Sequence, residues 1–337
     1  MKRARCFTVL AVFTALLCVP PPLPVFAAAP VTLIAMTTTS GVFPYVVSIA
    51  RTLSSHCPDT SVIVMDSTGN VDNTGQIRDG TARMASCVAH SDYESYTGTG
   101  PNFAGRPFKD FRILWYYEKS PVQICVARDS GIETLRDLDG RPFSAGGTGT
   151  TASGLVHSVL DLLNIHPKYF ESDHYGATDA YLEKQIDGVV KIGPAPDHYV
   201  SYLNSERPIR ILPIDDEDVN KILAAIPSVR AGIRPANVYE GIDSNIRCLS
   251  TYHGIQADMS FTQEQGYQFF KAMWEEGRKV WQRTYPVGAN NNVPVLTVEA
   301  AMTPLHAGTV QYLVEHGYTV PENLIPEEYV PAAPHID

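Results

Sequence analysis

The stretch VTLIAMTTTSGVFPYVVSIARTL (31–53) contains the structural unit that predicts the fold. Its first six residues form an apolar run typical of a buried strand, and the polar segment TTTSG (37–41) follows directly. Apolar residues then recur at the three- and four-residue spacing of an amphipathic helix, at Val46, Val47, Ile49, Ala50 and Leu53. We therefore expect a strand, a polar loop and a helix in succession.

The same order of strand, polar loop and helix recurs along the chain. Further strands are predicted at SVIVM (61–65), ARMASCVAH (82–90), VQICVAR (122–128), RPFSAG (141–146) and GVVKIG (188–193). A helix is predicted at TDAYLEKQIDG (178–188), whereas SDYESYTG (91–98) is expected to be a loop. This alternation is typical of a mostly parallel α/β sheet, and its two successive sets predict two lobes.

Two more helices are predicted near the end of the chain. A long one spans 262–283 with a broad apolar stripe, and we expect its tryptophan and methionine side chains to belong to the core and not to a binding site. A final helix spans 305–316, where Gly317 is placed to end it.

The amino terminus has the pattern of a secretory signal. Lys2, Arg3 and Arg5 precede an apolar run over 7–19, and VFAAAP (25–30) offers small residues for cleavage, so the mature chain is expected to begin near Ala28. The alternative is an uncleaved anchor, which the short run and the prolines directly after it disfavour. Lipid attachment at Cys18 is not expected, because two leucines stand where a small residue is needed.

The composition restricts the partners of the mature chain. Loss of three basic residues with the signal changes the net charge from −10 to −13, which makes nucleic acid a poor partner. Four cysteines remain, Cys57, Cys87, Cys125 and Cys248, and their spacing matches no metal-ligand pattern. Buried free thiols and one disulfide both remain open.

Polar loops follow the predicted strands at the ends where ligands bind in open α/β sheets. These loops are TTTSG (37–41), DSTGNVDN (66–73), HSD (90–92), GGTGTT (146–151) and GPAPD (193–197). Helix N-termini leave backbone N–H groups unpaired and hold partial positive charge, so they can bind a carboxylate without a basic residue. The candidate ligand-binding residues in the first four loops are Thr39, Ser40, Thr68, Asn70, Asn73, His90, Ser91, Asp92, Thr148, Thr150 and Thr151.

Each candidate also has a simpler structural interpretation. The threonines, serines and asparagines are residues that cap helices, and any one of them could do only that. Lys191 lies in a strand-like run and points either into the cleft or to solvent. Asp92 either accepts a hydrogen bond from a ligand amine or holds a neighbouring loop.

Sequence signatures of enzymes are missing. The chain has no GxSxG, HExxH or CxxC motif, and GGTGTT lacks the lysine of a phosphate-binding loop. His90, Ser91 and Asp92 are adjacent in sequence, but a catalytic triad is defined by proximity in space. We therefore expect a binding protein, monomeric, with no metal, cofactor or prosthetic group.

Several segments together resemble the TAXI family of TRAP transporter solute receptors. They are TSGVFPY, STGNVDN, AHSD, VQICVARDSGIETLRDLDGR, GGTGTT, IDGVVKIGPAP and TPLHAGTVQYLVEHG, and they extend over nearly the whole mature chain. The segment DSGIETLRDLDGR is common to many two-lobed binding proteins, whereas its combination with STGNVDN and HAGTVQYLVEHG is more specific.

The resemblance implies a type II periplasmic binding fold, in which two α/β lobes are joined by two crossing strands and close on a ligand. The crossings are expected around 117–123 and 247–253, so that residues 29–119 with 250–337 form lobe 1 and residues 120–249 form lobe 2. It also implies a periplasmic location, membrane permease partners driven by an ion gradient, and amino-acid-like or dicarboxylate solutes such as glutamate or 2-oxoglutarate.

The chain departs from the family pattern at two cleft positions. Asn70 stands where a serine is usual, and His90 stands where a glutamine is usual. The solute therefore cannot be transferred from the family. A sensory module that contacts a receptor kinase and a cleft enzyme are the two alternative functions.

Overall fold

The computed structural model describes residues 30–331. The predicted signal segment falls in 1–29, outside the described residues. Within the described part, no helix has both the length and the apolar character needed to cross a membrane.

Ten strands of the described chain form one mixed sheet, in the order β2-β1-β3-β10-β4-β7-β5-β6, with β8 paired to β4 and β9 to β10. The strands are β1 (Val31–Ile34), β2 (Val62–Met65), β3 (Met84–Val88), β4 (Phe111–Ala127), β5 (Pro142–Ser144), β6 (Lys168–Tyr169), β7 (Gly188–Ile192), β8 (Ile209–Ile211), β9 (Arg230–Arg234) and β10 (Ile246–Asp258).

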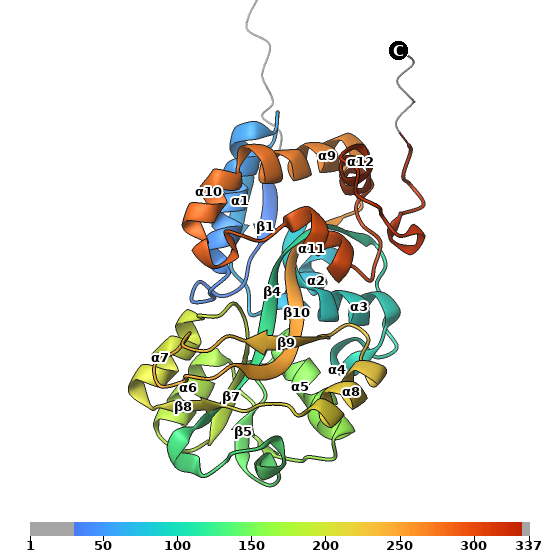
Figure 1. Ribbon diagram of the computed structural model, residues 1–337. Helices are drawn as coiled ribbons and strands as arrows, with labels where there is room; N and C mark the ends of the chain where they lie inside the picture. The colour runs from blue at the N-terminus through green and yellow to red at the C-terminus, as the bar shows by residue number, and fades with distance from the viewer. Residues whose placement is uncertain (1–29, 332–337) are drawn as a thin grey trace, which may run out of the picture.

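Helices cover the sheet in both halves of the molecule (Figure 1). They are α1 (Phe43–His56), α2 (Asn70–Arg78), α3 (Ala89–Thr97), α4 (Gly100–Phe103), α5 (Thr151–Leu162), α6 (His174–Leu182), α7 (His198–Glu206), α8 (Asp216–Ala225), α9 (Gln263–Lys271), α10 (Arg278–Thr284), α11 (Val293–Ala300) and α12 (Ala307–Glu315).

Two long strands, β4 and β10, run from one lobe into the other and pair antiparallel over 111–121 and 250–258. Pro121 lies where β4 exchanges β10 for β7 as its partner, and a proline without an N–H suits a point where one ladder ends. The predicted fold class, two α/β lobes joined by two crossing strands, is confirmed. Buried apolar side chains form separate clusters, one drawn from 31–117 and 252–324 and two from 122–249.

The sheet is mixed and not mostly parallel as a whole. The four parallel ladders, β1–β2, β1–β3, β5–β6 and β5–β7, lie within the lobes. Every antiparallel ladder involves β4 or β10. The long strands run in opposite directions because one leaves lobe 1 and the other returns to it.

Residues 91–97 belong to helix α3 and only Gly98 lies beyond its end, so the prediction of a loop over 91–98 is wrong. The buried residues of α3 are mostly polar and include His90, Ser91, Asp92 and Glu94. A helix whose buried face is polar has no apolar periodicity, and the sequence pattern therefore does not show it.

The predicted helix 262–283 is present with an interruption. It consists of α9, a π-helical turn over Ala272–Glu276, and α10 after Gly277. Phe270, Met273 and Trp281 are fully buried, which confirms that this stripe belongs to the core. The last predicted helix is α12, and Gly317 follows it at φ +79°, a left-handed conformation that favours glycine.

Candidate functional site

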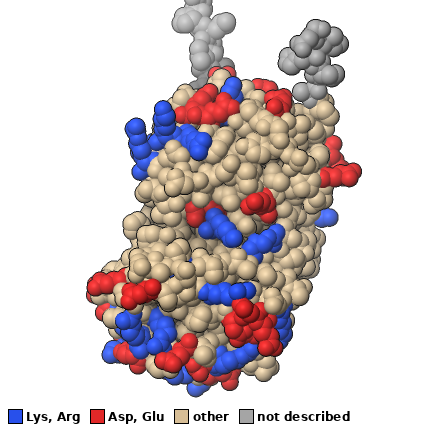
Figure 2. Space-filling model, viewed as in Figure 1, with Lys and Arg blue, Asp and Glu red and all other residues tan. Residues whose placement is uncertain are grey.

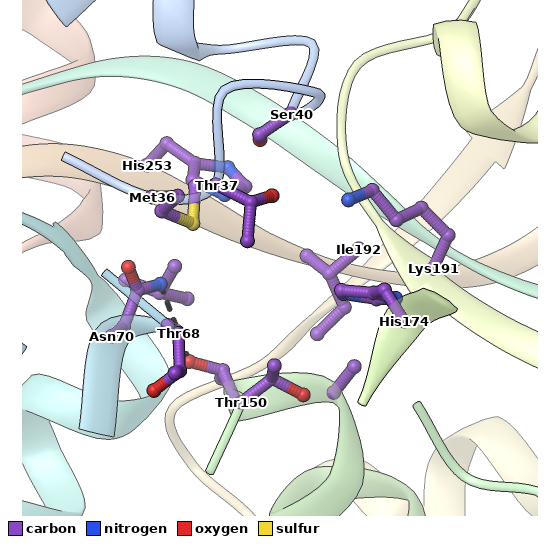
Figure 3. Close-up of a pocket in the computed structure, with 14 residues that line it drawn as sticks. Met36, Thr37, Ser40, Thr68, Asn70, Thr150, His174, Lys191, Ile192 and His253 are labelled. Carbon is purple, nitrogen blue, oxygen red and sulfur yellow. Dashed lines mark hydrogen bonds between the residues drawn. The ribbon is translucent and has the colours of Figure 1, made fainter. Parts of the chain in front are cut away.

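A small cavity of about 30 Å³ lies between the two lobes (Figure 3). Lobe 1 contributes the loop before α1, the start of α2, the end of β3 and His253 of β10, whereas lobe 2 contributes the start of α5, His174 and the end of β7. The lining residues are Met36, Thr37, Ser40, Thr68, Gly69, Asn70, Val88, Thr150, Thr151, Ala152, His174, Lys191, Ile192 and His253.

The N-termini of α2 and α5 meet at this cavity from opposite lobes. Thr150 caps α5, since its Oγ1 accepts a hydrogen bond from the Ser153 N–H, whereas Gly69 begins α2 without a side-chain cap. A Cβ at Gly69 would lie 3.1 Å from the Gly149 carbonyl oxygen and 3.1 Å from the Thr150 methyl group. Glycine at position 69 therefore permits the close approach of two helix ends, each with partial positive charge.

Lys191 is the basic residue of the cavity. It lies on β7, only 7% of it is exposed, and its side chain points toward the space between Thr37, Ser40 and His253 (Figure 3). Among the described residues, no ion pair within 4.0 Å includes Lys191, and no aspartate or glutamate lines the cavity. A buried cation without a paired anion favours an anionic ligand, because burial of an unpaired charge is costly.

Two histidines beside Lys191 are uncharged at neutral pH. Burial, with a smaller contribution from the Lys191 charge, lowers the pKa of both His174 and His253 to about 3. The Nδ1 atom of His253 lies 2.7 Å from Ser120 Oγ, a hydrogen bond between the two long strands. A β-bulge at His253 and Gly254 sets the direction of this side chain.

The structure brings half of the sequence-predicted residues to the cavity wall: Ser40, Thr68, Asn70, Thr150, Thr151 and Lys191. Thr39 and Thr148 line two grooves that adjoin the cavity. Asn73, His90, Ser91 and Asp92 do not line it. They lie behind its wall, where they are 0 to 1% exposed.

These four buried residues make hydrogen bonds within the protein. Asn73 bonds to Ser67 and to the Ser86 carbonyl oxygen, and Asp92 Oδ2 accepts a 2.7 Å hydrogen bond from the Tyr116 hydroxyl. Burial raises the pKa of Asp92 to about 7, although the Tyr116 hydrogen bond opposes this shift. Asp92 thus fits the structural interpretation better than contact with a ligand amine.

Helix α3 contacts lobe 2 through two of these side chains. Ser91 Oγ lies 2.7 Å from Thr151 Oγ1, and His90 Nδ1 lies 2.7 Å from Ser228 Oγ. His90 Nε2 also lies 3.3 Å from Glu94, but burial lowers the pKa of His90 to about 4 and raises that of Glu94 to about 7. His90 is therefore uncharged at neutral pH, and its contact with Glu94 is not an ion pair.

Sequence reasoning missed Met36, Thr37, His174 and His253. The helix of His174 was expected to begin at Thr178, yet Asp173 caps α6 by accepting from the Gly176 N–H, which brings His174 into its first turn. An aspartate before a helical run is a usual N-cap signal and would have moved the predicted start. His253 had no local signal, because its position depends on the pairing of β10 with β3 and β4.

Two open grooves adjoin the cavity. The first, of about 440 Å³, is lined by Thr38, Thr39, Ser40, Pro44, His174, Tyr175, Thr178, His198, Tyr199 and Tyr202. The second, of about 520 Å³, includes three carboxylates, Asp66, Asp72 and Asp173. We call them the aromatic groove and the acidic groove.

The four described cysteines are free and buried. Of the two alternatives that the sequence left open, free thiols and one disulfide, the structure has the free thiols.

A family model described as the NMT1-like family matches residues 34–317 of this chain. Among solved structures, that of the periplasmic binding protein BugD is similar at 13% identity, with 85% of this chain and 94% of that chain covered and a TM-score of 0.52. MatC from Rhodopseudomonas palustris, solved with bound malate, is similar at 13% identity, with 81% and 91% covered and a TM-score of 0.53. At this identity the likeness shows the fold, that of periplasmic binding proteins.

Proposed function

Because the chain belongs to the NMT1-like family, we propose that it is an extracytoplasmic receptor that binds a small organic anion between its lobes. The observation that carries this proposal is Lys191, a buried ammonium group that points into the interlobe cavity without a carboxylate partner among the described residues. The ends of α2 and α5 add partial positive charge at the same place.

Closure of the lobes is the proposed binding mechanism. Ser91 and His90 of α3 bond to Thr151 and Ser228 in the other lobe, so the closed arrangement has contacts that separated lobes would lack. A ligand that contacts both lobes shifts the population toward closure by its difference in affinity for the two states. The ligand-contacting residues are proposed to be those that line the cavity, with Thr39 and Thr148 at its edges.

The role in transport is a further part of the proposal. We propose a receptor of the TAXI type that delivers its solute to TRAP membrane permease subunits and works as a monomer in the periplasm after removal of the signal segment. Its lobes would comprise 29–119 with 250–337, and 120–249. On the face in Figure 2, acidic and basic side chains lie in small mixed groups, a surface without the broad basic patch of a nucleic-acid-binding protein.

The first test is native mass spectrometry of the mature protein, followed by thermal shift with the compound that it carries. We expect an intact carboxylate that raises the melting temperature with increasing concentration. Loss of that shift in Lys191→Met, with the variant still folded, would support the site. A chain that takes up no organic acid at millimolar concentration, or that converts the compound to a product, would contradict the proposal.

The transport role is tested separately by reconstitution with a permease encoded beside it. Solute uptake that requires both components is expected. Activation of a neighbouring receptor kinase by the loaded protein, without uptake, would instead support the sensory alternative.

A further inference from the structure

In this arrangement of the lobes, the cavity at Lys191 has room for a head group and not for a whole solute. Its volume of about 30 Å³ corresponds to the space of one or two water molecules, which is about the size of a carboxylate. In this arrangement of the lobes, the remainder of a bound solute must therefore extend into one of the two grooves that adjoin the cavity.

The aromatic groove is continuous with the cavity. Ser40 and His174 line both spaces, and the Tyr199 ring in the groove lies 5.7 Å from the Lys191 ammonium and 5.3 Å from the His174 ring. A carboxylate bound at Lys191 therefore places the next atoms of its solute beside Tyr199.

The chemistry of this groove suits an uncharged, apolar body. No aspartate, glutamate, lysine or arginine is among its lining residues, and it includes three tyrosines. Two of these rings are unusually open to solvent, Tyr175 at 58% and Tyr202 at 48% exposure. Tyr175 lies on α6 and Tyr199 and Tyr202 lie on α7, and these two helices lie side by side below the loop that precedes α1 (Figure 1).

The acidic groove disfavours a dicarboxylate as the solute. Asp66, Asp72 and Asp173 line it, and their negative charge would repel the second carboxylate of a dicarboxylate whose first carboxylate is at Lys191. The cavity is too small for two carboxylates, and the aromatic groove offers no cation for the second one.

We propose that the solute is a monocarboxylate with an aromatic or apolar body, the carboxylate bound at Lys191 and the body in the aromatic groove against Tyr199, Tyr175 and Tyr202. This inference rests on the proposed function and narrows it. Stacking and apolar contact with the tyrosines would select the body, while Lys191 and the helix ends would select the charge.

Calorimetric titration of the mature protein tests the inference with defined probes. These are phenylacetate, 3-phenylpropionate, indole-3-acetate and octanoate, compared with acetate, glutarate, 2-oxoglutarate and glutamate, and with neutral phenylacetamide. We expect at least one of the first four to bind at least tenfold more tightly than every one of the next four, and phenylacetamide not to bind.

Variants in the aromatic groove separate the contribution of the solute's body to the affinity from that of its head group. Tyr202→Ala is expected to lower the affinity for the best probe about 3- to 10-fold, since one aromatic contact contributes that much. The affinity for acetate should not change. Tyr202→Phe should retain the affinity. Ile233→Ala, which shortens another exposed apolar side chain on β9, is the matched control.

The outcomes distinguish this inference from the proposed function. Tightest binding by glutarate, 2-oxoglutarate or glutamate, lost in Lys191→Met, would overturn the aromatic-body inference and leave the receptor function standing. An equal loss for acetate and for the best probe in Tyr202→Ala would also overturn it. Absence of binding by all the acids would overturn both.

Discussion

The ammonium group of Lys191 lies 5.7 Å from the centre of the Tyr199 ring, so one contact joins the interlobe cavity to the aromatic groove. The Tyr199 hydroxyl lies 3.4 Å from Thr178 Oγ1, which ties α7 to α6. The electron-rich face of an aromatic ring attracts a cation without neutralising it. The contact with Tyr199 thus leaves the side chain of Lys191 available to an incoming anion.

Replacement of Lys191 by methionine tests the source of anion affinity. We expect carboxylate affinity to fall roughly 10- to 100-fold, the range of one charged hydrogen bond. The free energy of unfolding should stay equal or rise, because methionine is similar to lysine in length and removes an unpaired buried charge. Titration calorimetry and urea unfolding measure the two quantities. Lys221→Met on the exposed surface of α8 is the control, and an affinity equal to that of the control would refute the assignment.

The hydrogen bond between Ser91 and Thr151 is expected to favour closure. Ser91→Ala and Thr151→Val should each weaken solute binding about 2- to 10-fold, and the double variant should lose little more, because one hydrogen bond contributes roughly 0.5–1.5 kcal/mol. Small-angle X-ray scattering should show a less compact protein at subsaturating solute. Ser95→Ala on the same helix removes a buried hydroxyl without a described partner and is the matched control. Strictly additive losses would show that the contact does not couple the lobes.

The cavity histidines predict a loss of stability in acid. The pKa of His174 and of His253 is about 3 in the folded protein and about 6.5 when unfolded, so the unfolded chain binds more protons between these values. The contribution of each neutral histidine to the free energy of unfolding is fully present above pH 6.5 and is lost as the pH falls toward 3. Urea unfolding should give a smaller decrease from pH 6.5 to 4.5 in His174→Gln than in the unchanged protein, by about 1 kcal/mol or more. Parallel curves would contradict the burial of a neutral imidazole.

Asp92 predicts the opposite pH dependence. Its pKa is about 7 when folded and near 3.8 when unfolded, so its contribution is fully present below pH 3.8 and is lost as the pH rises through 7. Asp92→Asn keeps an acceptor for the Tyr116 hydroxyl and removes this loss. From pH 5 to pH 8 we expect the variant to gain about 2 kcal/mol relative to the unchanged protein in chemical unfolding. Asp161→Asn, on the exposed surface of α5, should gain nothing.

The thiols should be unreactive in the folded protein. All four described cysteines are buried, and burial raises the pKa of Cys57 to about 12 and that of Cys248 to about 11. We expect iodoacetamide to label them only after unfolding, since the thiolate is the reactive form. A reductant should leave the melting temperature of the mature chain unchanged. A lower melting temperature in reductant would reveal a disulfide.

Local sequence patterns were sufficient for the two-lobed fold. The unit at 31–53 and its repeats predict strands, polar loops and helices in alternation, an order that is found in few fold architectures. The same patterns identified Lys191 as a candidate, but all five residues of β7 are buried, so alternation could not tell which way the side chain points.

What only the tertiary structure decided is which residues meet. The cavity wall combines positions 36, 37, 40, 68 to 70, 88, 150 to 152, 174, 191, 192 and 253, which come together because β4 and β10 cross between the lobes. The sequence determined which segments form strands, helices and polar loops, since those depend on neighbours a few residues apart. Pairing between distant segments decides three other features: the burial of α3 by polar contacts, the inward direction of Lys191 and the position of His253. Local periodicity carries no information about that pairing.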